Sequence, residues 1–363
     1  MPREPRRRIF IDLTPLRESR DLRWLLGGQL VSLLGNQLTA VAIPYQVYVL
    51  THSSLDVGLV SLAQLIPLLI CSLYGGTVID ATDRRKLLIR VELVMALCSA
   101  GLGVNTDLGA RLWPLFVLPA IASGLTGFDN PTRNAIVPRL VRTDQIATAS
   151  AMVQVLNQVG VIVGPAMGGL LLAGAGADFV YWFDAATFLA AIAGAWAISP
   201  QPKSEGATRP GLRSIAEGFR FIRHRQGIQG AYLIDINAMV FGMPRALFPA
   251  MAVNVFHGGA TTVGFLYAAP GVGALVGALA TGWVTRIRRQ GLTVIVAVMV
   301  WGAAIVAFGL TSFLWLGLLF LAIAGWADVI SAVLRNTIIQ LSVPDRLRGR
   351  LAAIQIGVVQ GGP

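Results

Sequence analysis

Apolar side chains occur in ten long, nearly continuous runs, and the short segments between them hold most of the charged residues. A helix needs roughly 20 apolar residues to cross a bilayer core about 30 Å thick. Strands of a membrane barrel would instead alternate apolar and polar residues. The pattern therefore predicts an all-α integral membrane protein. The predicted spans are residues 24–50, 57–79, 87–106, 112–138, 146–173, 179–198, 227–254, 261–285, 292–310 and 314–338.

A polar, proline-containing stretch divides these spans into six and four, and an eleventh apolar run begins near Leu351. We expect a bundle of two six-helix repeats whose C-terminal repeat is truncated, with about ten full spans plus part of an eleventh. The expected divisions are a cytoplasmic N-terminal segment at 1–23, a six-helix bundle at 24–198, a cytoplasmic linker at 199–226 and an incomplete C-terminal bundle at 227–363. The basic, partly amphipathic part of the linker predicts a short helix on the inner leaflet.

Composition and charge agree with a membrane protein. Charged residues are 13% of the 363 residues and apolar residues are 55%, whereas soluble domains carry about 25% charged residues. The net charge of +11 would suit a nucleic-acid binder, but 27 of the 29 basic residues fall on one side of the predicted topology. This bias places the N-terminus in the cytoplasm. It predicts a multi-pass protein of the cell membrane whose partner is the lipid bilayer and not nucleic acid.

The two groups of spans show traces of an internal repeat. Val57-Gly58 aligns with Val263-Gly264 at a shift of 206 residues, and the segment Arg133-Asn134 aligns with Arg335-Asn336 at a shift of 202. Gly164-Pro165 aligns with Gly362-Pro363 at a shift of 198. Three matches in the same order at similar shifts predict two homologous bundles, and transporters built from such repeats bind substrate between them.

The loop after the second span has the spacing of a known motif. Its matching positions are Gly76, Asp80, Arg84, Arg85 and Lys86. Glycine permits close helix contact, an aspartate caps a helix N-terminus, and the basic run anchors the loop at the membrane surface. The loop resembles the signature loop of the major facilitator superfamily, for which a gating role is implied. Ala81 and Asp83 replace the basic residue and the glycine of that pattern, and Arg286 stands where the second copy would have an aspartate.

The fifth span carries a run of glycines at helical spacing. The run consists of Gly160, Gly164, Pro165, Gly168 and Gly169. Glycines on one helix face let a neighbouring helix approach closely, and proline is expected to kink the helix. The run resembles the motif that marks exporters of the same superfamily, although Ala151 replaces an earlier glycine of that motif. Generic small-residue packing is the alternative interpretation.

Further segments narrow the resemblance to the branch of enterobactin exporters and drug:proton antiporters. The segments are Pro244–Pro249, Val263–Ala269, Gly325-Trp326 and Leu347–Arg350. The resemblance implies secondary active export of a siderophore or an amphiphilic drug coupled to protons, with no ATP, cofactor or metal. It also implies that the first, fourth, seventh and tenth helices line a cavity.

Ionisable residues inside predicted spans are functional candidates because they are costly in lipid. Glu92 and Asp184 lie near span ends, where snorkelling or capping is expected. Asp129 precedes Asn130-Pro131, where a helix break and local capping are expected. The remaining candidates for proton coupling or substrate binding are Asp235, Arg245 and Asp328. Asp328 is placed to pair with Arg335 or with Arg245, and structural ion pairs remain the alternative for all three.

Three amides of the first span, Asn36, Gln37 and Gln46, are candidates for hydrogen bonds to a polar substrate. Hydrogen bonding between helices is the alternative role. A membrane enzyme is a rival function, but the three histidines fall on different sides of the membrane and no nucleotide-binding lysine motif is present. A passive facilitator, a channel or a membrane sensor is a second rival.

Overall fold

The computed structural model describes residues 13–201, 229–230, 233, 237, 242–279 and 290–342, and every regular element in these ranges is a helix. Eight of the described helices are long and apolar enough to cross a membrane. The α-helices are α1 (Thr14–Glu18), α2 (Arg20–Thr51), α3 (Ser54–Ala81), α4 (Arg84–Asp107), α5 (Leu112–Ile136), α6 (Ile146–Ala197), α9 (Phe248–Asn254), α10 (Ala260–Leu279), α11 (Gln290–Leu310) and α12 (Leu314–Ser342). Short 3₁₀ turns are η1 (Val137–Arg139), η2 (Thr143–Gln145) and η3 (Arg245–Leu247).

Helix α6 contains two of the predicted spans, joined at Gly176. This glycine has φ 88° and ψ 170°, a conformation that is open to glycine and closed to most other residues. The close contacts with α2 are Leu33 with Gly160, Leu38 with Gly168, Gly35 with Thr187 and Gly28 with Ala191. The residue numbers of the contacting positions on α2 increase along the first segment of α6 and decrease along the second. The chain therefore reverses direction at Gly176, as two separate spans require.

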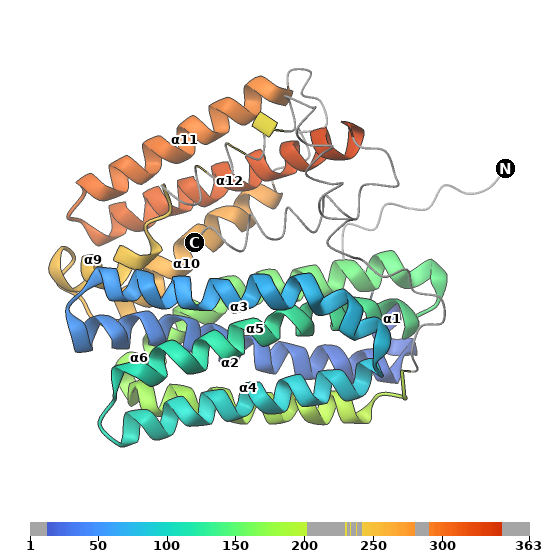
Figure 1. Ribbon diagram of the computed structural model, residues 1–363. Coiled ribbons are helices and arrows are strands. Elements are labelled where there is room, and N and C mark those ends of the chain that lie inside the picture. The colour runs from blue at the N-terminus through green and yellow to red at the C-terminus, as the bar shows by residue number, and fades with distance from the viewer. Residues whose placement is uncertain are drawn as a thin grey trace.

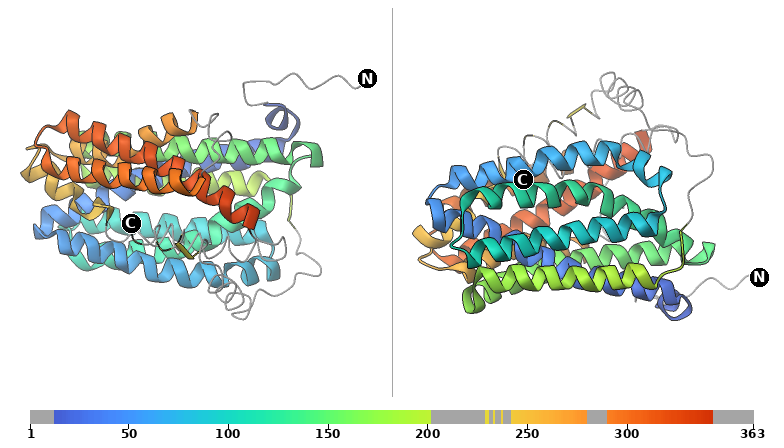
Figure 2. Two further views of the ribbon diagram at one scale, coloured as in Figure 1. Left: turned by 90° about the horizontal axis from the view of Figure 1, so that it is seen from above. Right: turned by 60° about the horizontal axis from the view of Figure 1, so that its bottom comes forward.

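Helices α2 to α6 form one group, and α10, α11 and α12 pack together as a second group beside it (Figure 1). The views of Figure 2 show the long helices of both groups running in roughly one direction. Contacts between the groups join α6 to α10, α2 to α9 and α10, and α3 to η3. We call the end of the bundle where α2 ends the Thr51 end, and the opposite end, where α4 begins, the Arg84 end.

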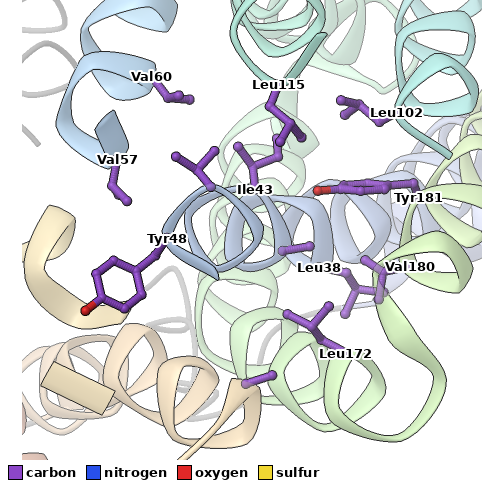
Figure 3. Packing of buried hydrophobic residues seen from close by; sticks show 13 residues of the cluster. Leu38, Ile43, Tyr48, Val57, Val60, Leu102, Leu115, Leu172, Val180 and Tyr181 are labelled. Atoms are coloured by element: carbon purple, nitrogen blue, oxygen red, sulfur yellow. The ribbon is translucent and has the colours of Figure 1, made fainter. Parts of the chain in front are cut away.

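Each end of the first group has its own apolar core. At the Thr51 end, buried residues of α2 to α6 meet, among them Ile43, Leu115 and the fully buried Tyr181 (Figure 3). At the Arg84 end, Leu25 and Leu88 pack with residues of α5 and α6. Many large apolar side chains point outward instead; Leu97 is 62% exposed. An apolar surface of this kind suits lipid and not water.

The seventh predicted span, 227–254, is not one continuous helix in its described part. Met243 and Pro244 lie outside any helix, η3 follows, and α9 starts at Phe248. Pro249 therefore stands in the first turn of α9, where its missing N–H costs nothing, and it does not kink a longer helix. Proline at 244 removes a further backbone donor, which explains why the helix stops before Arg245.

Two adjacent glycines on α2 provide a test of this packing. A Cβ on Gly28 would lie 2.9 Å from the Ala190 carbonyl oxygen, whereas a Cβ on Gly27 meets nothing within 4 Å. Gly28→Ala should therefore destabilise the protein by about 1–3 kcal/mol through overpacking. Gly27→Ala should be neutral or stabilise it slightly, because alanine favours helix. Thermal unfolding in detergent measures both, and equal transition temperatures for the two variants would contradict the α2–α6 contact.

Candidate functional site

The glycines of the fifth span pack against two different helices. Gly164 lies against the Gln37 side chain, and a Cβ on Gly168 would lie 3.1 Å from the Leu38 Cα, so both face α2. A Cβ on Gly169 would lie 2.7 Å from the Gly264 Cα of α10. Side chains at these positions would separate the helices. The run therefore holds α6 against its own group on one side and against the second group on the other.

Pro165 and Gly160 complete the run. Gly160 lies against Leu33 of α2, and the Pro165 carbonyl oxygen would lie 2.5 Å from a Cβ on Gly264. The one residue of α6 with non-helical dihedrals is Gly176. The expected kink at Pro165 is therefore not a helix break, and the helix reaches the α10 contact intact.

The two groups also meet through polar and small residues at the Thr51 end. Asn254 Nδ2 donates a hydrogen bond of 2.6 Å to the Tyr48 hydroxyl. A Cβ on Gly58 would lie 3.9 Å from the Ala246 methyl group. Tyr48 and Asn254 are separated by 206 residues, which equals the first of the three shifts of the expected internal repeat. The two groups thus contact each other through these side chains at the Thr51 end.

A polar cavity of about 230 Å³ lies inside the first group. It is lined by residues of α2 to α6, and the polar ones include Asn36, Gln37, Gln64, Ser99, Ser123, Thr126 and Asp184. Two of the three amides predicted as substrate ligands, Asn36 and Gln37, thus border a cavity.

The third predicted amide, Gln46, is placed differently. The Tyr181 hydroxyl donates a hydrogen bond of 2.7 Å to Gln46 Oε1, and Gln46 Nε2 donates one of 3.1 Å to Thr106 Oγ1. Both ends of the amide are therefore engaged by α6 and α4. This placement favours the alternative role of hydrogen bonding between helices.

Asp184 is 1% exposed, and the expectation of snorkelling or capping for it is wrong. Its Oδ2 atom accepts hydrogen bonds from Thr39 Oγ1 at 2.8 Å and Ser99 Oγ at 2.6 Å. Thr187 Oγ1 lies 3.5 Å from Oδ1 and donates a shorter bond to the Asp184 carbonyl. Counting from the reversal at Gly176, Asp184 is eight residues into its span, about 12 Å along the helix. The carboxyl group therefore lies deep in the bundle.

Arg245 lies in η3, beside the second group. The Tyr267 hydroxyl donates a hydrogen bond of 3.2 Å to the Arg245 carbonyl, and Asp328 of α12 lies within electrostatic range of the guanidinium group. Asp328 also lies 4.0 Å from Arg335, as the sequence predicts. Asp235, the remaining candidate for proton coupling, lies outside the described residues.

At the Arg84 end, the residue that caps α4 is Asp83 and not Asp80. Asp83 Oδ1 accepts from the backbone N–H groups of Arg85 at 2.9 Å and Lys86 at 3.2 Å. The departure from the superfamily pattern at this position thus provides a helix cap. Arg84 Nη1 donates to the Ala135 carbonyl at 3.3 Å, which joins the loop to α5. The surroundings of Gly76 and the side chain of Asp80 lie outside the part of the chain that the structure describes.

A buried ionic network joins α4 and α5 near the same end. The Arg133 guanidinium contacts the Glu92 carboxylate, and its Nε lies 2.9 Å from Asp129 Oδ2. Glu92 is 1% exposed, so the snorkelling expected for it is wrong. The helix also continues through Asn130-Pro131, so the break expected there is wrong, and Asp129 pairs with Arg133 one turn away. A neighbouring helix stabilises the proline-containing turn.

Comparison with known proteins identifies the family. A model of the transmembrane secretion effector family matches residues 11–363. The chain belongs to this family. Its membership confirms the resemblance to major facilitator exporters, and with the apolar helices it establishes a multi-pass membrane protein that acts in transport.

Curated relatives of this transmembrane secretion effector are named as exporters and not as enzymes. The enterobactin exporter EntS of Citrobacter koseri is 28% identical over 343 residues, which cover 94% of this chain and 82% of the relative. The enterobactin exporter EntS of Shigella boydii is 27% identical with the same coverage. The likeness thus extends over most of both chains.

Solved transporters share the fold at low sequence identity. A bacterial homologue of the iron transporter ferroportin, in the inward-facing state, has a TM-score of 0.69 at 16% identity, with 94% of this chain and 89% of that chain covered. A mutant of the nucleoside transporter NupG has a TM-score of 0.73 at 12% identity, covering 94% and 88%. The helices of this family member are therefore arranged as in known transporters.

The ionic network predicts a large loss of stability when its cation is removed. Arg133→Gln leaves two buried carboxylates without their cation and should cost about 3–5 kcal/mol. Glu92→Gln should cost less, because Asp129 still pairs with Arg133. The double variant should be less destabilised than the sum of the two, as a double-mutant cycle of thermal unfolding would measure. Arg142→Gln, which breaks an exposed pair with Asp144, is the control and should cost less than about 1 kcal/mol. Equal losses for Arg133→Gln and Arg142→Gln would contradict the network.

Proposed function

We propose that this protein is a secondary active exporter that moves a siderophore or an amphiphilic drug out of the cell in exchange for protons. The observation that carries the proposal is the double contact of α6, whose glycines face α2 and α10 at once. A helix packed this closely on both sides is a suitable pivot between two groups that rock against each other. The similarity to enterobactin exporters supports export as the direction and a siderophore as the substrate.

The proposed orientation places the Arg84 end in the cytoplasm and the Thr51 end outside. Basic residues cluster in the loops of the Arg84 end, whereas Arg111 is the exception among the loops of the Thr51 end. The N-terminus is then cytoplasmic, and the membrane is the cell membrane. The linker at 199–226 joins a bundle at 24–198 to a second bundle at 227–363 on the cytoplasmic side.

In this orientation the contacts between the described parts of the two groups favour an inward-facing form. The described contacts between the groups, which include Tyr48 with Asn254 and Gly169 with Gly264, lie toward the outer end. Export requires these contacts to separate so that substrate leaves on the outside. We assign the loop of Gly76, Asp80, Arg84, Arg85 and Lys86 a role in that conformational change and not in substrate binding.

Substrate and proton are assigned to different residues. Arg245, near Asp328 and the Tyr267 hydroxyl, provides a cation for an anionic substrate group. Asn36 and Gln37 provide hydrogen bonds from the cavity of the first group. Asp235 stays a candidate for proton transfer on the strength of its position in the seventh span. A passive facilitator, channel or sensor is the alternative and needs no proton gradient.

Everted membrane vesicles test the proposed function. Vesicles that contain the protein should accumulate enterobactin-type catecholate siderophores or cationic dyes when a proton gradient is imposed, and a protonophore should abolish the accumulation. Vesicles from cells without the protein provide the control. Accumulation that a protonophore leaves unchanged would favour a passive facilitator, and no movement of any compound tested would contradict export.

The pivot predicts a position-specific loss of transport. Gly169→Val places a branched side chain against the Gly264 backbone and should reduce transport at least tenfold. Gly174→Val, on the same helix segment, is the matched control because nothing lies within 4 Å of its Cβ position. Initial rates in everted vesicles, normalised to the amount of protein, measure both. Wild-type rates in the Gly169→Val variant would show that α6 and α10 need not approach closely.

A further inference from the structure

Asp184 is a buried carboxyl group with no described cation beside it. Among the described residues, the ion pairs involve other acidic groups, and the Asp184 carboxylate lies against hydroxyl groups. An uncompensated carboxylate deep in a membrane protein is costly and is a functional candidate by default. The exporter motif and the proposed substrate residues leave this group unexplained.

The positions of the hydroxyl groups around Asp184 indicate which ligand its carboxyl group binds. Thr39 and Ser99 come from two different helices and both donate to Oδ2, at 2.8 and 2.6 Å. Oxygens that share a metal ion at about 2.3–2.6 Å lie roughly 3.3 Å or more apart. The observed spacings are those of direct hydrogen bonds, and Oδ1, whose nearest hydroxyl is 3.5 Å away, has capacity for another hydrogen. The arrangement therefore suits a proton.

The polar cavity supplies a route to this group. Its volume of about 230 Å³ has room for several waters, and Asn36, Gln37 and Gln64 line it together with Asp184. Of the other titratable groups near the carboxyl, Tyr181 lies on the same helix and Cys98 on α4. The lining residues from α2, α3 and α5 carry no charge. Asp184 is thus the one acidic group among the residues that line the cavity.

We propose that Asp184, Thr39 and Ser99 form a proton-binding site inside the first helix group, reached through the cavity lined by Asn36, Gln37 and Gln64. One proton adds to Oδ1 of the carboxylate to give a neutral carboxylic acid, and the hydrogen bonds that Thr39 and Ser99 donate to Oδ2 weaken because their acceptor loses its charge. A role in coupling rests on the proposed proton-driven export, whereas proton binding does not.

The position of Thr39 connects the site to the contact between the groups. Thr39 follows Leu38, which packs against Gly168, and Gly168 precedes the Gly169 that meets α10. A change in the hydrogen bonds of Thr39 therefore affects the segment of α2 that packs against α6. Protonation can in this way favour one arrangement of the two groups over the other.

Infrared difference spectroscopy of the purified full chain tests proton binding without substrate. The wild-type protein should show a protonated-carboxyl C=O band that changes with pH, and Asp184→Asn should lose that component. Asparagine is isosteric and still accepts from Thr39 and Ser99, so the fold should persist, as thermal unfolding checks. Asp144→Asn, at an exposed loop carboxylate, should leave the component intact. An unchanged spectrum in Asp184→Asn, or a wild-type band insensitive to pH, would overturn the proposal.

Proteoliposomes with inverted orientation test the coupling. Asp184→Asn should reduce transport driven by a proton gradient at least tenfold and keep substrate counterflow within about twofold of wild type. Gradient-driven transport at the wild-type rate in this variant would overturn the coupling role. Transport driven by a sodium gradient in place of the proton gradient would show that the site takes a metal cation instead. If the wild-type protein transports nothing, the proposed function fails, and the infrared result still decides whether Asp184 binds a proton.

Discussion

The arrangement of this protein depends on the absence of side chains on two faces of α6. Lipid provides no hydrophobic driving force between helices, so association relies on close packing and on hydrogen bonds. Gly164 and Gly168 bring the backbone of α6 next to α2, and Gly169 brings it next to α10. The short hydrogen bond between Thr39 and Asp184 requires the same closeness, because α2 is held between both segments of α6. Larger residues at these glycines would separate the helices and break that bond.

Polar residues in the first helix group stabilise specific pairs of helices. Asp184 joins α2, α4 and α6, Gln46 joins the same three helices nearer the Thr51 end, and Arg133 joins α5 to α4 near the Arg84 end. Hydrogen bonds and ion pairs are directional, so they fix the rotation of each helix about its axis. Three such assemblies along the length of the group make it suitable to move as one rigid body.

The sequence predicts most of the spans because the bilayer demands long apolar runs, and this signal does not depend on tertiary contacts. The reversal between the fifth and sixth spans is likewise predictable from a glycine-rich segment. The burial of Glu92 and Asp184 is not predictable from the sequence. Distance from a span end shows how far a side chain lies from the membrane surface, but not whether it faces lipid or a neighbouring helix. For Asp184 the decisive partners, Thr39 and Ser99, are 145 and 85 residues away in the chain.

The helix break expected at Asn130-Pro131 is wrong for a related reason. Proline removes one backbone hydrogen bond, but membrane helices tolerate this loss where neighbouring groups restore it. Arg133 stabilises this turn in another way, through its pairs with Asp129 in the same turn and with Glu92 on α4. Arg335, which the expected repeat aligns with Arg133, pairs with Asp328 two turns back on the same helix, and Asp328 is also near Arg245. Arginine thus closes a buried network on α5, whereas on α12 it shares an acidic group with Arg245, so the two positions that the expected repeat aligns differ in chemistry.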